Sequence, residues 1–255
     1  MSDAPQSGAA WVQVNAWRKT QRGELVARRE AVPADQRKAW NDRITAHLVS
    51  AFEIPEDAIV GFCWPYKGEF DARFAIRHWR ERGATAALPQ VVQSKAPLVF
   101  RKWWPGAPMK AGVYDIPFPD STEVVAPDVA VVPMNGFDER GYRLGYGGGF
   151  FDRTLAAFER RVIAVGVSYD ILRLETIYPQ PHDIAMDFVV TEAGVYAAGG
   201  EALDLIDAEE SRRRFARLLL ARRLPRSAYP EGYSSPACYA AEFPGYWGEI
   251  DDAKK

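Results

Sequence analysis

The sequence predicts an α/β fold with a sheet that is at least partly parallel. Short apolar runs of strand length alternate along the chain with helix-compatible segments. The runs at 128–133 (DVAVVP) and 162–167 (VIAVGV) flank one such helical segment. Alternation of this kind favours crossover connections, which make successive strands parallel.

The expected helices rest on periodicity and on end signals. An apolar residue recurs every four positions from Trp40 to Phe52, which places these side chains on one side of a helix. Asp71 lies near the start of another helical segment, and Gly83 is a suitable stop for it. The expected helices cover residues 16–31, 34–52, 71–83, 151–160 and 205–224.

The expected strands are apolar runs bounded by proline, glycine or polar residues. They cover residues 58–64, 84–89, 97–103, 128–133, 162–167 and 186–191. The proline-rich segment 104–127 separates two of these runs and also contains several polar residues. We expect it to be a long loop, because proline cannot donate a hydrogen bond to a strand ladder.

Composition and charge exclude several classes of partner. The chain has 255 residues and a net charge of −2, so nothing draws it as a whole to nucleic acid or to a membrane. No apolar run approaches the roughly 20 residues of a membrane span, and the N-terminus lacks a signal-peptide pattern. Cys63 and Cys238 lie far apart and outside any CxxC pair, which is typical of reduced thiols. We therefore expect a cytoplasmic protein.

The character of the sequence changes after Gly200. A charged amphipathic segment is followed by a tail, residues 225–255, in which prolines are interleaved with tyrosines. Such a tail offers little regular structure but has too many aromatic residues for a simple linker. Three interpretations of this tail stay open: it packs over its own domain, it packs on a second copy or another partner, or it is disordered. We expect the main domain to occupy residues 1–200 and a C-terminal extension, open to self-association, to occupy 201–255.

A glycine-rich segment, RLGYGGGFFDRTL (143–155), has four glycines among positions 145–149, directly before a helix start. Glycine permits positive φ and lets backbone N–H groups approach an anion closely. The first helical turn adds unpaired N–H groups and a positive dipole end, and Arg143 adds a full charge. These features predict a phosphate-binding loop, although neither GxxxxGK[ST] nor GxGxxG is present. A tight loop packed against the sheet is the alternative.

Asp152, at the start of the following helix, has two interpretations. A carboxylate in this position usually caps the helix or interacts with its dipole. Beside bound phosphates it favours a cation in between, and Mg²⁺ held by one or two carboxylates and phosphate oxygens is the expected arrangement. His47, His78 and His182 share no metal-ligand spacing, and no Ser/His/Asp or Cys/His arrangement supports covalent catalysis.

The segment VVPMNGFDERGYRLGYGGGFFDRTLA (131–156) resembles the signature of the 5-formyltetrahydrofolate cyclo-ligase family, also called methenyltetrahydrofolate synthetases. Three further segments, RKTQRGEL, GFCWPYKGEFDAR and PQPHDIAMDFVVTE, resemble other parts of that family in the same order, so the resemblance spans roughly residues 16–192. It implies a single Rossmann-like domain with an open, mixed, mostly parallel sheet and helices on both faces. It also implies a reaction in which ATP and Mg²⁺ drive the conversion of 5-formyltetrahydrofolate to 5,10-methenyltetrahydrofolate, ADP and phosphate.

The resemblance also implies residue roles. Arg143 and Asp152 are the expected catalytic residues, and Asp152 and Asp183 the expected Mg²⁺ ligands, with Asp187 as a substitute for Asp183. Trp64, Glu69 and Phe150 are expected to bind the folate, Glu69 through the donor edge of the pterin. The expected ATP-binding residues are Arg18, Arg22, Arg143, Gly145, Tyr146, Gly147, Gly148, Gly149, Phe150 and Phe151.

Two positions depart from the family pattern. Phe150 and Phe151 stand where the family usually has at least one tyrosine, so a hydroxyl hydrogen bond is lost while ring stacking remains. Met134 replaces a common glycine and is expected to place bulk near the pocket wall. These departures leave two alternatives: a related ATP-dependent enzyme with another formyl or heterocyclic substrate, and a catalytically silent folate- or nucleotide-binding module.

Overall fold

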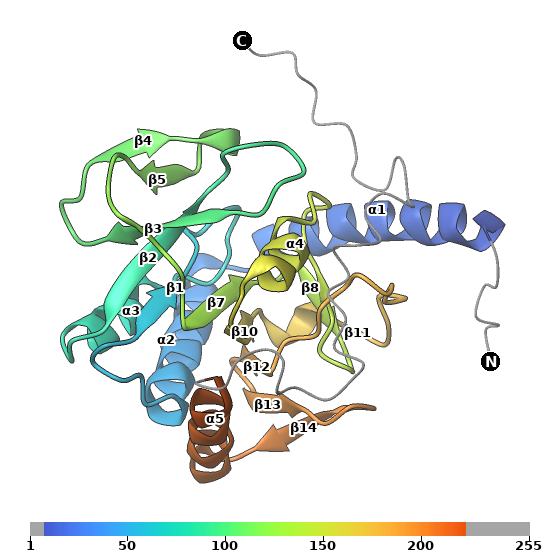
Figure 1. Ribbon diagram of the computed structural model, residues 1–255. Helices are drawn as coiled ribbons and strands as arrows, with labels where there is room; N and C mark the ends of the chain where they lie inside the picture. Colours follow the sequence, from blue (N-terminus) through green and yellow to red (C-terminus); the bar gives the residue numbers. More distant parts are fainter. Residues whose placement is uncertain (1–7, 223–255) are drawn as a thin grey trace.

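The computed structural model describes residues 8–222 of the chain (Figure 1). Predictions for the aromatic tail and for Cys238 concern residues outside this range. Within it, no helix combines the length and the apolar character that a membrane span requires.

One sheet of nine strands forms the centre of the molecule, in the order β14-β13-β12-β10-β7-β1-β2-β3-β6. The strands β12, β10, β7, β1 and β2 run parallel to one another, whereas β13, β14, β3 and β6 add antiparallel pairs at the two sides. The predicted mixed α/β sheet is therefore confirmed, with its parallel part in the middle. The strands are β1 Ile59–Gly61, β2 Thr85–Gln90, β3 Val99–Trp103, β6 Val124–Val125, β7 Val129–Pro133, β10 Ile163–Val167, β12 Phe188–Thr191, β13 Gly194–Ala198 and β14 Leu203–Ile206.

Helices cover both faces of this sheet, as predicted (Figure 1). Alternate residues of β7 belong to different core clusters: Val129 and Val131 pack with α2, α3 and α5, whereas Ala130 and Val132 face α4. This alternation follows from the two-residue period of a strand. The helices are α1 Gly8–Glu30, α2 Ala34–Ala51, α3 Arg73–Arg80, α4 Phe150–Ala157 and α5 Ala208–Arg222.

The boundaries of several predicted elements differ from the structure, α1 and β1 among them. α1 begins at Gly8 rather than at residue 16, because the intervening residues contain no proline and continue the helix with alanine, valine and tryptophan. The strand predicted over 58–64 is limited to Ile59–Gly61, so the chain leaves the sheet early and continues as a loop.

The prediction of a long loop over 104–127 is wrong. This segment forms a hairpin of β4 (Met109–Ala111) and β5 (Pro117–Pro119) around a short 3-10 turn, Val113–Asp115, before it reaches β6. Two of its prolines, Pro117 and Pro119, lie in this short two-stranded sheet, where strand edges do not require every backbone N–H. A small third sheet, β11-β8-β9, contains Arg173–Leu174, Gly136–Asp138 and Arg143–Leu144, and a second 3-10 turn covers Asp170–Leu172.

Residues 201–222 pack against the same core as the rest of the chain. β14 pairs with β13, and Phe215 of α5 lies edge-on to Phe52 with 5.2 Å between ring centroids. The helix predicted over 205–224 therefore begins later, after a strand. The predicted division at residue 200 falls in the turn between β13 and β14, and it stays a prediction.

Candidate active site

A cleft of about 440 Å³ opens at the carboxyl ends of the central parallel strands. From β1 the chain passes through α3 to β2, whereas from β7 it passes through α4 on the other face to β10. The strand order therefore reverses between β1 and β7, and open α/β sheets bind ligands at this kind of reversal. Cys63 and Trp64 after β1, Gln90 at the end of β2, and Pro133 at the end of β7 line the cleft.

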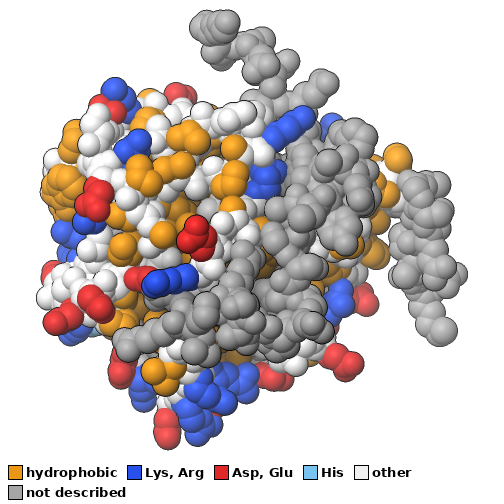
Figure 2. Space-filling view, in the orientation of Figure 1, with side chains coloured by type: hydrophobic (Ala, Val, Ile, Leu, Met, Phe, Trp, Pro, Cys, Tyr) orange, Lys and Arg blue, Asp and Glu red, His pale blue; other side chains and the backbone are white. Residues whose placement is uncertain are grey.

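The cleft is closed on other sides by α1, the β4–β5 hairpin and the glycine loop, residues 145–149. Figure 2 shows hydrophobic side chains among charged ones on the face that carries β4 and β5. Val113 and Tyr114, in the turn of that hairpin, are exposed and also line the cleft. A planar, partly apolar ligand has suitable walls here.

The geometry of the glycine loop explains three of its four glycines. Gly147 and Gly149 have left-handed backbones, with φ of 94° and 58°. A Cβ at Gly148 would lie 2.8 Å from the Phe150 ring, which is too close for contact. Gly145 has no comparable restriction, because its Cβ would meet only Arg143 Nε at 4.0 Å. Gly149 is also the N-cap of α4, so the loop passes directly into the helix.

Two buried ion pairs bring together four of the predicted site residues. The Arg143 guanidinium binds both carboxylate oxygens of Asp152, with N–O distances of 3.1 and 2.8 Å. Arg18 donates to Asp183 Oδ2 at 2.5 Å. All four residues line the cleft.

Arg18 and Arg22 project from neighbouring turns of α1. Besides Asp183, Arg18 binds the carbonyl of Ile177 through Nε at 2.9 Å, so it is 2% exposed and held in place. Arg22 donates from Nε to the carbonyl of Gly145 at 3.0 Å. Its guanidinium carbon lies 3.3 Å from the position that a Cβ at Gly147 would occupy. Arg22 thus places positive charge at the edge of the glycine loop, and Arg18 places it beside Asp183 in the same cleft.

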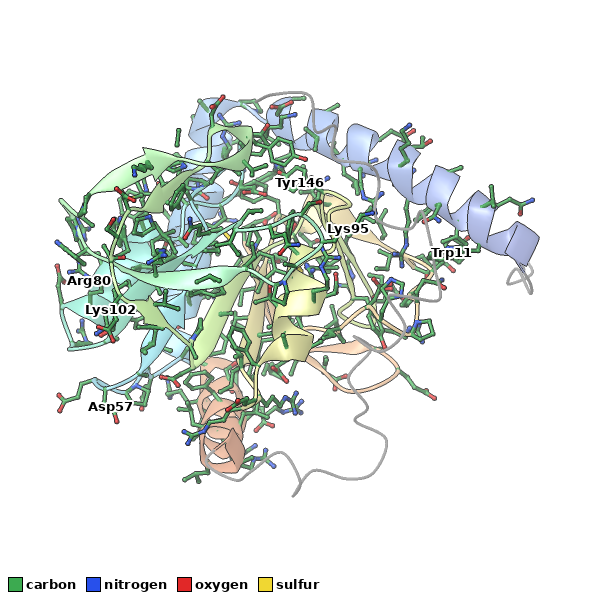
Figure 3. The ribbon with its side chains drawn as sticks, turned by 45° about the horizontal axis from the view of Figure 1, so that its top comes forward. Trp11, Asp57, Arg80, Lys95, Lys102 and Tyr146 are labelled. Carbon is green, nitrogen blue, oxygen red and sulfur yellow. The ribbon has the colours of Figure 1, made fainter. Side chains whose placement is uncertain are left out.

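Glu69 lies at another part of the cleft and is in contact with the glycine loop through Tyr146. The Tyr146 hydroxyl donates to Glu69 Oε1 at 2.8 Å, and the backbone N–H of Tyr66 donates to Oε2 at 3.1 Å. Burial raises the pKa of Glu69, while Arg29 and these two donors oppose the rise. Figure 3 shows Tyr146 in the loop before α4, beside α1.

The aromatic residues predicted to contact ligand line the cleft as well. Trp64 carries the Arg73 guanidinium over its ring at 4.6 Å and lies 6.2 Å from Trp103. Phe150 and Phe151 are half-buried, and the Arg143 guanidinium lies 5.4 Å from the Phe151 ring centroid. A cation over an aromatic face contributes roughly 0.5–2 kcal/mol, so these rings also support the arginines.

Two sequence expectations fall elsewhere in the molecule. Met134 is buried in the core against Gly166 and Met186 rather than in the cleft wall, so that prediction is wrong. Asp187, the substitute metal ligand, accepts hydrogen bonds from Arg161 and from the backbone N–H of Ala164. Both residues stabilise the packing of β12 beside β10.

Sequence reasoning missed three polar residues whose hydrogen bonds organise the site: Arg29, Asn135 and Arg153. Arg29 donates to Asn135 Oδ1 at 2.9 Å and to the Tyr146 hydroxyl at 2.8 Å. Arg153 donates to the carbonyl of Gly148. A signal was available for Arg29, because positions 18, 22, 25 and 29 share one helical face and Leu25 is an apolar marker of that face.

His182 is the histidine nearest to these groups. Its Nε2 lies 3.9 Å from Asp183 Oδ1, and burial lowers the pKa of its imidazole. Among the described residues there is no group of three or more His, Cys, Asp or Glu side chains arranged to hold a metal ion by itself. A metal at this cleft therefore depends on oxygens supplied by a ligand.

Comparison with known proteins identifies the family to which this chain is similar. A sequence model of the 5-formyltetrahydrofolate cyclo-ligase family matches residues 14–192. The Haemophilus influenzae 5-formyltetrahydrofolate cyclo-ligase is 27% identical over 172 residues, which cover 65% of this chain and 92% of that protein. The solved 5,10-methenyltetrahydrofolate synthetase of Aquifex aeolicus has a TM-score of 0.63 and 26% identity, over 73% of this chain and 96% of that one.

A second structure supports the fold alone. The 5,10-methenyltetrahydrofolate synthetase of Mycoplasma pneumoniae has a TM-score of 0.57 at 19% identity and covers 69% of this chain and 98% of its own. The family match spans well over half of the chain, including the glycine loop, both ion pairs and Glu69. This chain belongs to the 5-formyltetrahydrofolate cyclo-ligase family.

Proposed function

We propose that this protein carries out the reaction of its family in the cleft between α1, the glycine loop and the β4–β5 hairpin. In that reaction ATP drives the closure of 5-formyltetrahydrofolate to 5,10-methenyltetrahydrofolate, with release of ADP and phosphate. The observation that supports this site best is the hydrogen bond from Tyr146, within the glycine loop, to Glu69. It joins a loop suited to phosphate to a carboxylate suited to a heterocycle with N–H donors.

The chemistry requires two displacements. The formyl oxygen attacks the γ-phosphorus of ATP, and ADP leaves with the bonding electron pair. N10 of the folate then attacks the activated formyl carbon and loses its proton to solvent, the ring closes, and phosphate leaves with the former formyl oxygen. The protein mainly positions these groups and neutralises negative charge, as in other phosphoryl transfers.

The glycine loop and α4 form the nucleotide end of the site in this proposal. Backbone N–H groups near Gly147 to Gly149 and the first turn of α4 face the phosphates, supported by the dipole of the helix. Arg22 and Arg143 bring full positive charges to the same place, where charge develops on the transferred phosphoryl group. Arg18 contributes positive charge from the side of Asp183, because its guanidinium is already hydrogen-bonded to that carboxylate.

Asp152 and Asp183 are the residues that would hold Mg²⁺. Both carboxylates line the cleft, and one or two carboxylates completed by phosphate oxygens and water suit this ion. Each is paired with an arginine, so the donor set fits a cation that arrives with the nucleotide better than a permanently bound metal. When bound, Mg²⁺ would neutralise phosphate charge.

Glu69 is the proposed folate contact. Its carboxylate accepts hydrogen bonds from Tyr146 and Tyr66, and the remaining lone pairs can accept from pterin N–H groups. Trp64 and Phe150 provide aromatic walls for a flat ring system. The absence of a hydroxyl at Phe150 and Phe151 leaves stacking as their contribution.

The test is formation of the methenyl product, followed by its absorbance, from purified full-length protein with Mg·ATP and 5-formyltetrahydrofolate. Turnover that requires both ATP and the folate supports the proposal. We expect Arg143→Met to raise the KM for ATP and Glu69→Gln to raise the KM for the folate, each by about 10-fold or more, since each removes a hydrogen bond to a charged group. ATP binding without any product, with the Haemophilus influenzae enzyme active alongside, would overturn it.

Two further points belong to the proposal. A cytoplasmic location is consistent with ATP as the co-substrate. Self-association through the extension over residues 201–255 stays a prediction, and sedimentation analysis of the full chain tests it. A concentration-independent monomer would exclude it.

A further inference from the structure

Arg29 is a buried arginine close to the C-terminal end of α1. It is 1% exposed, and a buried guanidinium is costly unless its donors are paired. Its Nε donates to the carbonyl of Lys67 at 2.8 Å, one terminal nitrogen to Asn135 Oδ1 at 2.9 Å, and the other to the Tyr146 hydroxyl at 2.8 Å. One side chain therefore connects α1 to three segments that meet at the cleft.

The contact with Lys67 fixes the backbone that leads into Glu69. Lys67 has φ of 47° and Gly68 has φ of 73°, so two successive residues are left-handed. The left-handed conformation is unfavourable for a non-glycine residue such as Lys67. The Arg29 hydrogen bond to the Lys67 carbonyl opposes this cost, and the turn closes with the Glu69 N–H on the carbonyl of Tyr66 at 3.0 Å.

The contact with Tyr146 sets the direction of a hydrogen-bond chain. A guanidinium can only donate, so the Tyr146 oxygen accepts from Arg29 and keeps its single proton for another acceptor. That proton is donated to Glu69 Oε1 at 2.8 Å. With Arg29 in place, the chain favours Glu69 as an acceptor in its ionised form.

We propose that Arg29 is a positioning residue for the reaction: it holds the Glu69 carboxylate, through Tyr146 and the Lys67 carbonyl, as an acceptor directed at the folate. This inference rests on the proposed role of Glu69 in folate binding. Arg29 itself is placed behind Tyr146 and contacts no ligand in this account.

The proposal has a consequence for pH. The groups around Glu69 are Arg29 from α1, Tyr146 from the glycine loop, and the Cys63 thiol after β1, while Arg37 from α2 approaches Gly68. Burial raises the pKa of Glu69, and the Arg29 charge is the largest opposing effect. Removing Arg29 therefore raises this pKa further and moves the loss of folate binding at low pH to a higher pH.

The experiment measures folate binding by calorimetry without ATP, and the KM for folate and for ATP, between pH 5 and pH 9. The variants are Arg29→Met and Arg29→Lys, and the matched control is Arg28→Met. Arg28 is the exposed neighbour and makes one hydrogen bond, to the carbonyl of Ile171. Arg28→Met is expected to behave like the unaltered protein.

We expect Arg29→Met to weaken folate binding about 10- to 100-fold, with a smaller change in the KM for ATP. The loss of folate binding at low pH, here called the acid limb, should move upward by about one pH unit. Arg29→Lys keeps the charge but cannot reach all three acceptors. It should weaken binding while its acid limb stays near that of the unaltered protein. A residue that only stabilises the fold would lower the melting temperature without moving the acid limb.

Glu69→Gln separates this inference from the proposed function. If Glu69→Gln leaves folate binding unchanged, the assignment of Glu69 to the folate is wrong. If it weakens binding but Arg29→Met leaves the acid limb in place, only the role of Arg29 is overturned. Should Arg29→Met fail to fold, Tyr146→Phe decides, because it interrupts the same chain at the hydroxyl: an upward shift of the acid limb supports the proposal, and an unchanged limb refutes it.

Discussion

Replacement of Gly147 by alanine tests the glycine loop most directly. At φ of 94° an L-residue is strained, and its Cβ would lie 3.3 Å from the Arg22 guanidinium carbon. Backbone strain of this kind costs about 1–3 kcal/mol. Relief of the backbone strain has to move the loop, so the N–H groups that we propose to face the phosphates are expected to move with it.

A second glycine provides the matched control. Gly23 lies in the interior of α1, one residue after Arg22, and among the described residues no heavy atom outside its chain neighbours and the nearby helix backbone lies within 4 Å of the position of its Cβ. Alanine at Gly23 should stabilise the helix by about 0.5–1 kcal/mol. The same chemical change is therefore expected to have opposite signs at the two positions.

The assay combines thermal unfolding of the full chain with the KM for ATP in the methenyl product assay. A change of 1 kcal/mol corresponds to about 2–4 °C in Tm for a domain of this size. Gly147→Ala should lower the Tm and raise the KM for ATP about 10-fold, because a displaced N–H loses a hydrogen bond to a charged group. Gly23→Ala should raise the Tm and keep the KM. If Gly147→Ala matches the unaltered protein in both quantities, the account of the loop is refuted.

Three further outcomes are expected. Arg161→Met should destabilise the protein by about 2 kcal/mol at pH 8, because the buried Asp187 loses its partner, with a discount for the partial exposure of Arg161. Burial already raises the pKa of Asp187, so the folded variant takes up a proton before the unfolded chain does as pH falls. The loss of unfolding free energy, measured by chemical denaturation, should therefore shrink towards pH 5. A loss that does not depend on pH would contradict this. Phe215→Ala should cost about 3–5 kcal/mol in the same assay, and a neutral result would separate α5 from the core. Chelation with EDTA should abolish turnover yet leave the Tm of the nucleotide-free protein unchanged, whereas a lower Tm would indicate a structural metal.

Much of the parallel centre of the sheet could be predicted, because its strands are continuous apolar runs separated by helices. Val129 to Val132 are buried on both faces, so hydrophobicity alone marks the strand. The β4–β5 hairpin could not be predicted in this way. Pro117 and Pro119 argue against a strand in general, and they are acceptable here because β5 pairs with β4 alone among the described strands.

The candidate site could be predicted where a local pattern suggests its chemistry, and its residues were missed where distant parts of the chain meet. The glycines and Arg143 lie close together in sequence, so their proposed joint role rests on neighbouring positions alone. Arg29 and Tyr146 are 117 residues apart, and nothing local links a helical arginine to a tyrosine in a glycine loop. Likewise the pairing of each predicted metal carboxylate with an arginine depends on the folded arrangement.

The attachment of α1 has a consequence for synthesis of the chain. Arg18 leaves the ribosome well before its hydrogen-bond acceptors, the carbonyls of Ile177 and Tyr178, which follow 159 and 160 residues later. Contacts so distant along the chain form late in folding, because their closure entropy must first be offset by other structure. A nascent chain that stops before Ile177 thus lacks the acceptors that hold Arg18, so the part of the cleft lined by Arg18 is complete only after Tyr178 has been translated.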